Sequence, residues 1–192
     1  MPDATATMTR PHPTPQPTPH SRSTLALMLP WLILAVVVGA LDQITKQMVM
    51  ANLHHGQVIP VTSFFDLVLV FNPGAAFSFL ADHGGWQRWF FTALAVVISG
   101  WLLALMYQHR HERMLPAAFA LIIGGALGNV YDRLVHGAVV DFLHFHYAGW
   151  SWPAFNLADS AITVGVVLML WGQLLSHGSH GTHDQARPGA HS

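Results

Sequence analysis

The chain has 192 residues, of which 9% are charged and 52% are hydrophobic, and its formal net charge at pH 7 is −1. Because an ordinary soluble domain has roughly a quarter of its residues charged, this composition excludes a water-soluble surface and indicates a membrane protein. The chain has no cysteine, which excludes disulfides and a thiol nucleophile.

The chain begins with a segment that is unlike the rest. Met1–Ser23 contains six of the twelve prolines, with Thr and Ser between them and no apolar periodicity. Such a segment cannot bury a core, so we expect residues 1–23 to form a disordered leader. The apolar run after it is long and continues into Asp42, which is not the pattern of a cleaved signal peptide, so this run is expected to remain in the mature protein.

Four long apolar runs follow the leader. They contain seventeen to twenty consecutive uncharged residues and, at about 1.5 Å per residue, reach roughly 26 to 30 Å, close to the hydrocarbon thickness of a bilayer. We therefore predict an all-α polytopic fold with four transmembrane helices. Gly124 and Gly128 form a small-xxx-small pair that predicts close helix packing. The four runs are Ser23–Leu41, Trp89–Gln108, Met114–Tyr131 and Ser160–Ser176.

The segment from about Gln47 to Trp86 has a different pattern. Its residues from Val58 to Phe71 are rich in β-branched and aromatic types with turn formers between them, which is typical of short strands. We predict a small extracytoplasmic β-containing element on the membrane surface, between the first and second helices. The alternative is an irregular loop.

The end of the chain, residues 177–192, is rich in Gly, Ser and His. Three histidines at three-residue spacing could hold a metal, but a solvated, disordered cytoplasmic tail is the favoured interpretation. The expected organisation is therefore a leader, a four-helix membrane domain over residues 24–176, and a tail. The histidines of the tail are His177, His180, His183 and His191.

The basic residues predict the orientation. Five of the eight Lys and Arg residues lie in the leader, in the tail, or between the second and third helices. By the positive-inside rule both termini are then cytoplasmic, and the loops after the first and third helices face outward. The five are Arg10, Arg22, Arg110, Arg113 and Arg187, and the three on the opposite side are Lys46, Arg88 and Arg133.

The reactive residue types narrow the chemistry. The sole glutamate, Glu112, lies in the inner loop outside any HExxH pattern, so a zincin-type site cannot be assembled. There is no GxSxG motif, and the sole lysine, Lys46, lies at a predicted helix end, which disfavours a Ser/Lys site. Aspartates are left, and Asp141 and Asp159 flank the loop between the third and fourth helices, where neighbouring helices can bring them together.

Asp141 and Asp159 are a candidate catalytic pair. An ionisable group at the boundary of an apolar run is costly and is therefore a functional candidate. Two carboxylates close together cannot both ionise easily, so one pKa rises and the pair shares a proton. The ionised partner can take a proton from a water that attacks a peptide carbonyl, while the protonated partner polarises that carbonyl. This chemistry needs no metal or cofactor, and none is expected.

Two other classes of function are compatible with four helices and several aspartates. Intramembrane acids also mark proton-coupled transporters and channels, but here the acids cluster at the outer boundary and no internal repeat is visible. A non-catalytic assembly partner would account for the helices but would leave Asp141 and Asp159 without a role. A catalytic role for these two aspartates is the favoured interpretation.

Five motifs occur in order: LDQITK at Leu41–Lys46, FNPGAAF at Phe71–Phe77, GNVYDR at Gly128–Arg133, VVDF at Val139–Phe142 and FNLADS at Phe155–Ser160. With them the chain resembles lipoprotein signal peptidases, the bacterial signal peptidase II family, over about Leu25–Trp171. The resemblance implies an aspartyl endopeptidase of the cell inner membrane that cuts prolipoproteins before a diacylglyceryl-modified cysteine, with Asp141 and Asp159 as catalytic pair. It also implies membrane lipids and globomycin-type inhibitors as partners. A monomer and no nucleic-acid partner are expected.

The resemblance further implies substrate-binding roles for Asn72, Asn129, Arg133 and Asn156. Arg133 would hold a backbone carbonyl or a lipid headgroup, and Asn156 would also position the catalytic pair. Simpler structural roles stay open for two of them. Asn72 could be an ordinary turn asparagine, and Asn156 could be the N-cap of the fourth helix, with Asp159 reaching back to its backbone N–H.

Three charged residues are supporting candidates. Asp42 and Lys46 are spaced i, i+4 with the acid first, the favourable order for an intrahelical ion pair; this structural role and a role in shaping the substrate groove both stay open. Asp132 shares one face of the third helix with Asn129 and Arg133. An ion pair between Asp132 and Arg133 at the helix end is the structural alternative for Asp132.

Overall fold

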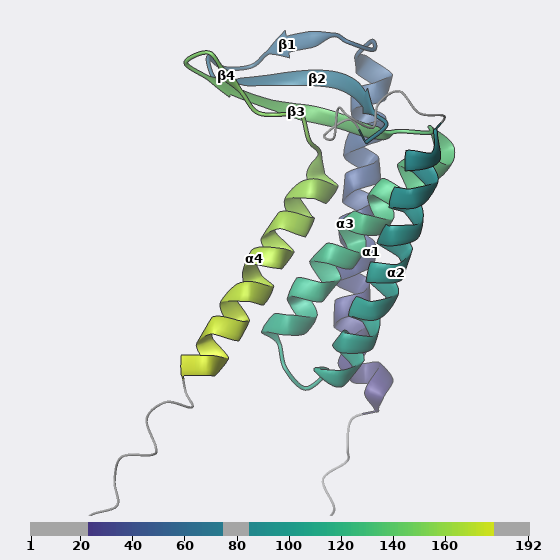
Figure 1. Ribbon diagram of the computed structural model, residues 1–192, viewed down its shortest axis with the longest axis vertical. Coiled ribbons are helices and arrows are strands. Elements are labelled where there is room, and N and C mark those ends of the chain that lie inside the picture. Colours follow the sequence, from purple (N-terminus) through teal and green to yellow (C-terminus); the bar gives the residue numbers. More distant parts are fainter. Residues whose placement is uncertain (1–22, 75–84, 179–192) are drawn as a thin grey trace, which may run out of the picture.

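Four helices form a bundle long enough to cross a membrane, and a four-stranded sheet covers one end of it (Figure 1). The structure is a computed structural model that describes residues 23–74 and 85–178. The predicted fold class is confirmed, because each predicted span lies on one of the four helices. These are α1 (Thr24–Asn52), α2 (Trp86–Gln108), α3 (Met114–Val135) and α4 (Leu157–Gly178).

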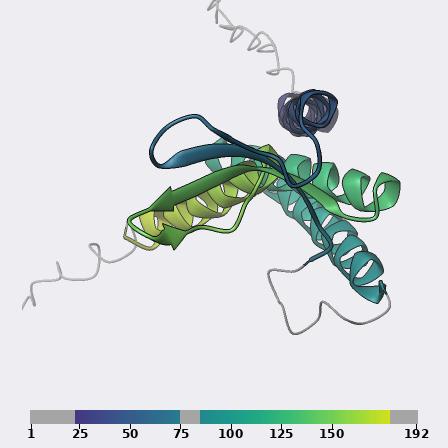
Figure 2. The same ribbon diagram turned by 90° about the horizontal axis from the view of Figure 1, so that it is seen from above.

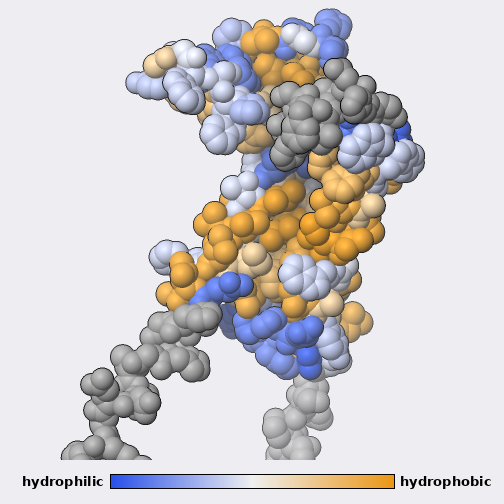
Figure 3. All heavy atoms as spheres, in the orientation of Figure 1, coloured by the Kyte–Doolittle hydropathy of each residue, from blue (hydrophilic) through white to orange (hydrophobic). Residues whose placement is uncertain are grey.

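The outer surface of the bundle is apolar. Side chains such as Val36 on α1, Val97 on α2 and Leu174 on α4 are about 70% exposed, which is expected where lipid replaces water as the solvent. Figure 3 shows this apolar band across the helices, with polar residues at both ends of the bundle. The N-terminal end of α1 and the C-terminal end of α4 both lie at the end of the bundle opposite the sheet (Figure 1).

Helix α1 continues well beyond its apolar run. The prediction ended the run at Leu41 and placed Lys46 at a helix end, but the helix extends to Asn52. Lys46 therefore lies inside the helix, and both it and Asp42 are fully buried. The helix continues because its charged side chains find partners inside the protein, so they do not have to reach water.

The sheet has the antiparallel order β1-β2-β3-β4. Strands β1 (Val58–Pro60) and β2 (Phe65–Asn72) come from the segment between α1 and α2, so the predicted β-containing element there is confirmed. Strands β3 (Val139–Tyr147) and β4 (Trp150–Ser151) come from the connection between α3 and α4, where no strand was predicted. In Figures 1 and 2, β3 and β4 extend toward the side to which α4 tilts.

The register of β2 and β3 brings two motifs together. Val70 pairs with Asp141 and Asn72 pairs with Val139, and an irregularity between Leu67 and Val70 shifts the pairing along the strands. A bulge of this kind re-aims side chains locally. Phe71 and Asn72 of the FNPGAAF motif are thereby placed beside the VVDF motif, far away in the sequence, at one end of the bundle.

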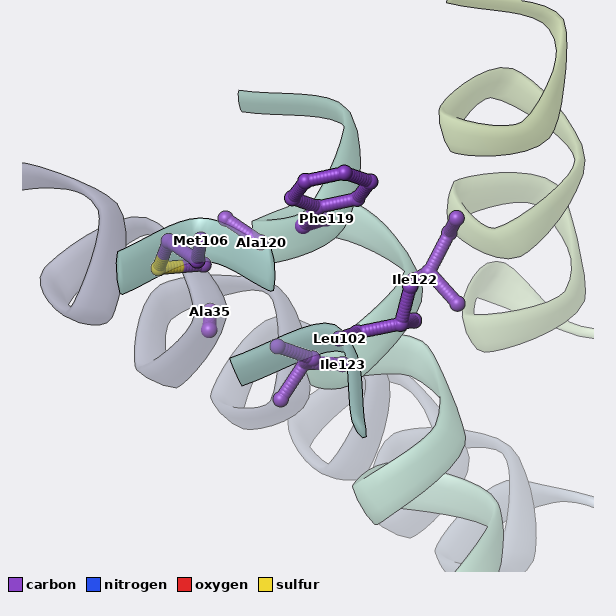
Figure 4. Packing of buried hydrophobic residues seen from close by; sticks show 7 residues of the cluster. All are labelled: Ala35, Leu102, Met106, Phe119, Ala120, Ile122 and Ile123. Carbon is purple, nitrogen blue, oxygen red and sulfur yellow. The ribbon is translucent and has the colours of Figure 1, made fainter. Parts of the chain in front are cut away.

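Helix α3 is the centre of the bundle and packs against the other three helices. A buried cluster joins α1, α2 and α3 through Ala35, Leu102, Met106, Phe119, Ala120, Ile122 and Ile123 (Figure 4). Close approach to α1 depends on glycine, because a Cβ on Gly124 would lie 2.5 Å from the Ala35 carbonyl oxygen and 2.9 Å from the Val38 Cβ. The predicted close packing at Gly124 and Gly128 is thus observed, and the partner helix is α1.

We predict that Gly124→Ala lowers the free energy of unfolding by about 1 to 3 kcal/mol, because the added methyl group meets backbone atoms that cannot move aside alone. The measurement is thermal or denaturant unfolding of the purified protein in detergent. Gly100→Ala on α2 is the matched control, since its Cβ would meet no atom within 4 Å, and it should be neutral or stabilising by up to about 1 kcal/mol. Equal effects of the two variants would contradict this account.

Candidate active site

Asp141 and Asp159 meet at the junction of sheet and bundle, although they come from different kinds of element. Asp141 lies on β3 and is 2% exposed, and Asp159 lies in the first turn of α4. Asn156 connects them: its Nδ2 donates to Asp141 Oδ1 (2.7 Å), and its Oδ1 accepts from the Asp159 N–H (2.9 Å). The Asn156 N–H also donates to Asp159 Oδ2 (3.3 Å). The capping role and the positioning geometry predicted as alternatives for Asn156 therefore occur together.

Two further amides hold the outer oxygens of the pair. Asn72 Nδ2 donates to Asp141 Oδ2 (2.9 Å), and Asn129 Nδ2 donates to Asp159 Oδ1 (2.8 Å). Asn72 also accepts from the Gly74 N–H through its Oδ1 (2.9 Å), so the turn that was its structural alternative is present as well. Each carboxylate thus receives side-chain hydrogen bonds from groups that are themselves fixed.

The environment of Asp141 favours its protonated form. Burial, and to a smaller extent the nearby Asp159 carboxylate, raise the pKa of Asp141, and the net value is about 6. The hydrogen bonds from Asn72 and Asn156 and the charge of Lys46 act in the opposite direction. The sheet therefore supplies a carboxyl group that takes up a proton at a higher pH than an ordinary aspartate.

Lys46 is at the centre of a buried network behind the pair. Its ammonium lies 2.7 Å from Asp42 Oδ2 and 2.7 Å from Asp132 Oδ2, and it donates to Asn129 Oδ1 (2.9 Å). Lys46, Asp42 and Asp132 are all fully buried. The predicted Asp42–Lys46 ion pair is confirmed, and Asp132 completes it from α3.

The acids of this network also bind the backbone next to the catalytic candidates. Asp42 Oδ1 accepts from the Ala158 N–H (2.9 Å), and Asp132 Oδ2 accepts from the Val140 N–H (3.1 Å). Ala158 directly precedes Asp159, and Val140 directly precedes Asp141. One charged network therefore fixes the backbone immediately before both members of the pair.

Arg133 does not form the ion pair with Asp132 that was the structural alternative for Asp132. That prediction is wrong, because adjacent residues on a helix point in different directions and Asp132 binds Lys46 instead. Arg133 donates to the Asn129 carbonyl (3.3 Å), and its guanidinium lies 5.6 Å from the ring centroid of Phe91. It lines an apolar groove of about 400 Å³ between α2, α3 and α4, together with Asp159.

Sequence reasoning missed one side chain of the network. Gln43, within the LDQITK motif, donates to Asp132 Oδ1 (2.8 Å) and to the Gly128 carbonyl (3.1 Å). The only feature of the sequence that could have pointed to Gln43 is its position within that motif. Among the described residues no group of three or more His, Asp or Glu side chains could hold a metal ion. The predicted tail histidines His180, His183 and His191 lie outside the described residues.

Comparison with known proteins identifies relatives of the whole membrane domain. Residues 34–175 match the model of the family described as signal peptidase (SPase) II. A lipoprotein signal peptidase of Azoarcus sp. (strain BH72) is 74% identical over 153 residues, which cover 80% of this chain and 87% of that protein. A lipoprotein signal peptidase of Polynucleobacter necessarius is 51% identical over 147 residues, or 77% and 90% of the two chains.

Solved structures give the same result for the fold. A structure described as a bacterial membrane enzyme, solved by the in meso method at 2.3 Å resolution, superposes with a TM-score of 0.70 at 29% identity, covering 82% of this chain and 94% of that one. A second, described in the same way at 1.9 Å resolution, gives a TM-score of 0.67 at 31% identity and covers 76% and 92%. The sheet-capped bundle is therefore shared with known membrane enzymes.

We predict that Lys46→Met lowers the free energy of unfolding by about 3 to 5 kcal/mol, because it leaves the Asp42 and Asp132 carboxylates buried without a cation. Unfolding of the purified protein in detergent measures the loss. Asp132→Asn introduced into Lys46→Met should recover part of it by removing one uncompensated charge. A Lys46→Met protein as stable as the wild type would show that the network does not carry this role.

Proposed function

The chain belongs to the signal peptidase II family, and we propose that it is an aspartyl endopeptidase that removes the signal peptide from diacylglyceryl-modified prolipoproteins, cutting before the lipidated cysteine. The observation that carries the proposal is the geometry of Asn156, whose side chain donates to the buried Asp141 carboxylate and whose backbone N–H donates to the half-buried Asp159 carboxylate. A pair arranged in this way can share one proton and act as acid and base together.

The environments of the two carboxylates suggest their roles. Asp159, in the first turn of α4 and held by two N–H donors, is the group that takes a proton from the attacking water. Asp141, with its raised pKa, carries the proton, polarises the scissile carbonyl and later protonates the leaving nitrogen. Asn72, Asn129 and Asn156 keep the carboxyl groups oriented while these protons move.

The groove between α2, α3 and α4 is the proposed site of the lipidated part of the substrate. Its walls include Leu94, Ile98, Ile122 and Ile162, and Arg133 and Asp159 lie at its polar end. Apolar walls suit acyl chains or a signal-peptide helix. The Arg133 guanidinium can hold a backbone carbonyl or a lipid headgroup oxygen beside Asp159.

The placement in the membrane is part of the same proposal. We propose that the enzyme lies in the bacterial inner membrane as a monomer, with both termini cytoplasmic and the active site near the outer leaflet. The arginines of the α2–α3 connection support this orientation. Globomycin-type inhibitors are expected to occupy the same site as the substrate.

The proton-coupled transporter has less support. In the described part of the four helices, the acids Asp42, Asp132 and Asp159 all lie at the sheet end, beside the start of α4 or β3, and the rest of each span is mostly apolar. A transport path needs polar groups through the thickness of the membrane. The family membership also favours the peptidase.

We predict that Asp141→Asn and Asp159→Asn each reduce cleavage of a purified, lipid-modified precursor by roughly a thousandfold or more, because neither amide can share and pass the proton. Since the two groups act as one unit, the double variant should be no worse than either single one. Glu112→Gln, in the exposed loop at the other end of the bundle, is the control and should keep full activity. Near wild-type cleavage by either single variant would refute the aspartyl mechanism.

The lipid on the substrate should strongly increase the rate of cleavage. Each CH₂ buried in the groove contributes about 0.8 kcal/mol, so burying only three of them accounts for roughly a 50-fold preference. We expect a precursor that lacks the diacylglyceryl group to be cleaved at least that much more slowly than its modified counterpart. The measurement is kcat/KM for both forms in the same detergent, and equal values would rule out lipid recognition by this groove.

A further inference from the structure

The sheet contains a cavity that the proposed chemistry does not use. It has a volume of about 530 Å³, within the range of ligand sites in proteins. One wall is formed by Val58 on β1 and by Val68 and Val70 on β2, and the other by residues 152–154, which connect β4 to α4. The cavity belongs to the sheet, which lies beyond the spanning helices (Figure 1).

The cavity has one polar region, built around Asp66. Asp66 is 8% exposed, and its Oδ2 lies 3.3 Å from His144 Nδ1 and 3.1 Å from His146 Nε2. His144 Nε2 lies 2.6 Å from the Ser151 hydroxyl. A carboxylate that lies between two histidine rings, one of them fixed in turn by Ser151, is a defined recognition element, because its orientation does not have to be ordered when a ligand binds.

The cavity adjoins the catalytic pair at two points. Val70, in its wall, is the register partner of Asp141. Trp152 lines this cavity and also a second one, which contains Asp159. Trp152 is 69% exposed and is the residue that these two spaces share. A chain that leaves Asp159 past Trp152 therefore enters the cavity on the sheet.

Topology identifies the occupant, if the function proposed above is correct. The signal peptide and the acyl chains lie within the membrane, so the part of the precursor that must pass the extramembrane sheet is the polypeptide after the scissile bond. We propose that the cavity binds the first residues of this polypeptide that follow the lipidated cysteine. The valine walls take an extended backbone with small apolar side chains.

The charge of the cavity selects between basic and acidic residues of the precursor. Asp66 is the only acid among the lining residues, and no Lys or Arg is among them. A Lys or Arg side chain of the precursor that reaches Asp66 gains an opposite charge at low exposure, whereas a Glu side chain meets a like charge. The cavity therefore favours precursors with a basic residue shortly after the cysteine.

The first test fills the cavity and varies the substrate. Two lipid-modified precursors share one signal peptide, and one ends directly after the cysteine whereas the other continues for ten residues. Val58→Trp should raise KM for the long precursor several-fold, with kcat little changed and the short precursor unaffected. Val61→Trp is the matched control, because Val61 is 52% exposed against 54% for Val58 but does not line the cavity.

The second test uses the charge. The precursors are long ones in which a single residue, at the second, third, fourth or fifth position after the cysteine, is either Lys or Glu. At one of these positions the wild-type kcat/KM should be about tenfold higher for the Lys precursor than for the Glu precursor. Asp66→Asn should abolish this ratio, and Asp66→Glu should restore part of it.

The outcomes separate this proposal from the proposed function. If the wild type cleaves both the short and the long precursor but Val58→Trp leaves their ratio of kcat/KM unchanged, the subsite is wrong and the peptidase is not. The same conclusion follows if Asp66→Asn leaves the Lys/Glu ratio unchanged. If the wild type cleaves neither precursor, the proposed function itself is overturned.

Discussion

The buried ammonium of Lys46 is the interaction on which the rest of the site depends. It is bound by Asp42 on its own helix and by Asp132 on α3, and each of these acids uses a carboxylate oxygen to hold the backbone N–H of the residue that directly precedes Asp159 or Asp141. Burying three charges is costly, and the cost is offset only when each has good partners. Here those partners are the start of α4 and the start of β3, so the same contacts that satisfy the charges also place Asp159 and Asp141.

Close helix packing is what makes this network possible. Gly128 lies opposite Asp42, where a Cβ would come within 2.6 Å of the carboxylate, and a Cβ on Gly125 would collide with the Ala158 carbonyl oxygen. The small residues of α3 thus bring α1 and α4 near enough for short polar side chains to reach across. In lipid, where no hydrophobic driving force acts between helices, such packing and hydrogen bonding replace it.

Much of this arrangement could be predicted from the sequence, and the exceptions have physical reasons. The four spans follow from uninterrupted apolar runs, and the catalytic candidates follow from Asp141 and Asp159 at the boundary of such runs. The i, i+4 spacing of Asp42 and Lys46 revealed their ion pair, but it could not reveal Asp132, because local spacing contains no information on a partner 86 residues away. Strand β3 was missed because its partner β2 lies before α2 in the chain, and a strand is stabilised by such distant pairing.

Asn156 combines two roles in one side chain, and this limits what evolution can place there. An ordinary helix N-cap accepts Ser, Thr, Asp or Asn almost equally well. Asn156 must accept the Asp159 N–H and at the same time donate to Asp141. Aspartate has no such donor when ionised and would add a further negative charge beside the pair, and the hydroxyl of Ser or Thr is shorter and has a single hydrogen. Of the good helix caps, asparagine alone meets both requirements. A position that can hold any of several residue types in most helices is therefore restricted to asparagine in this one.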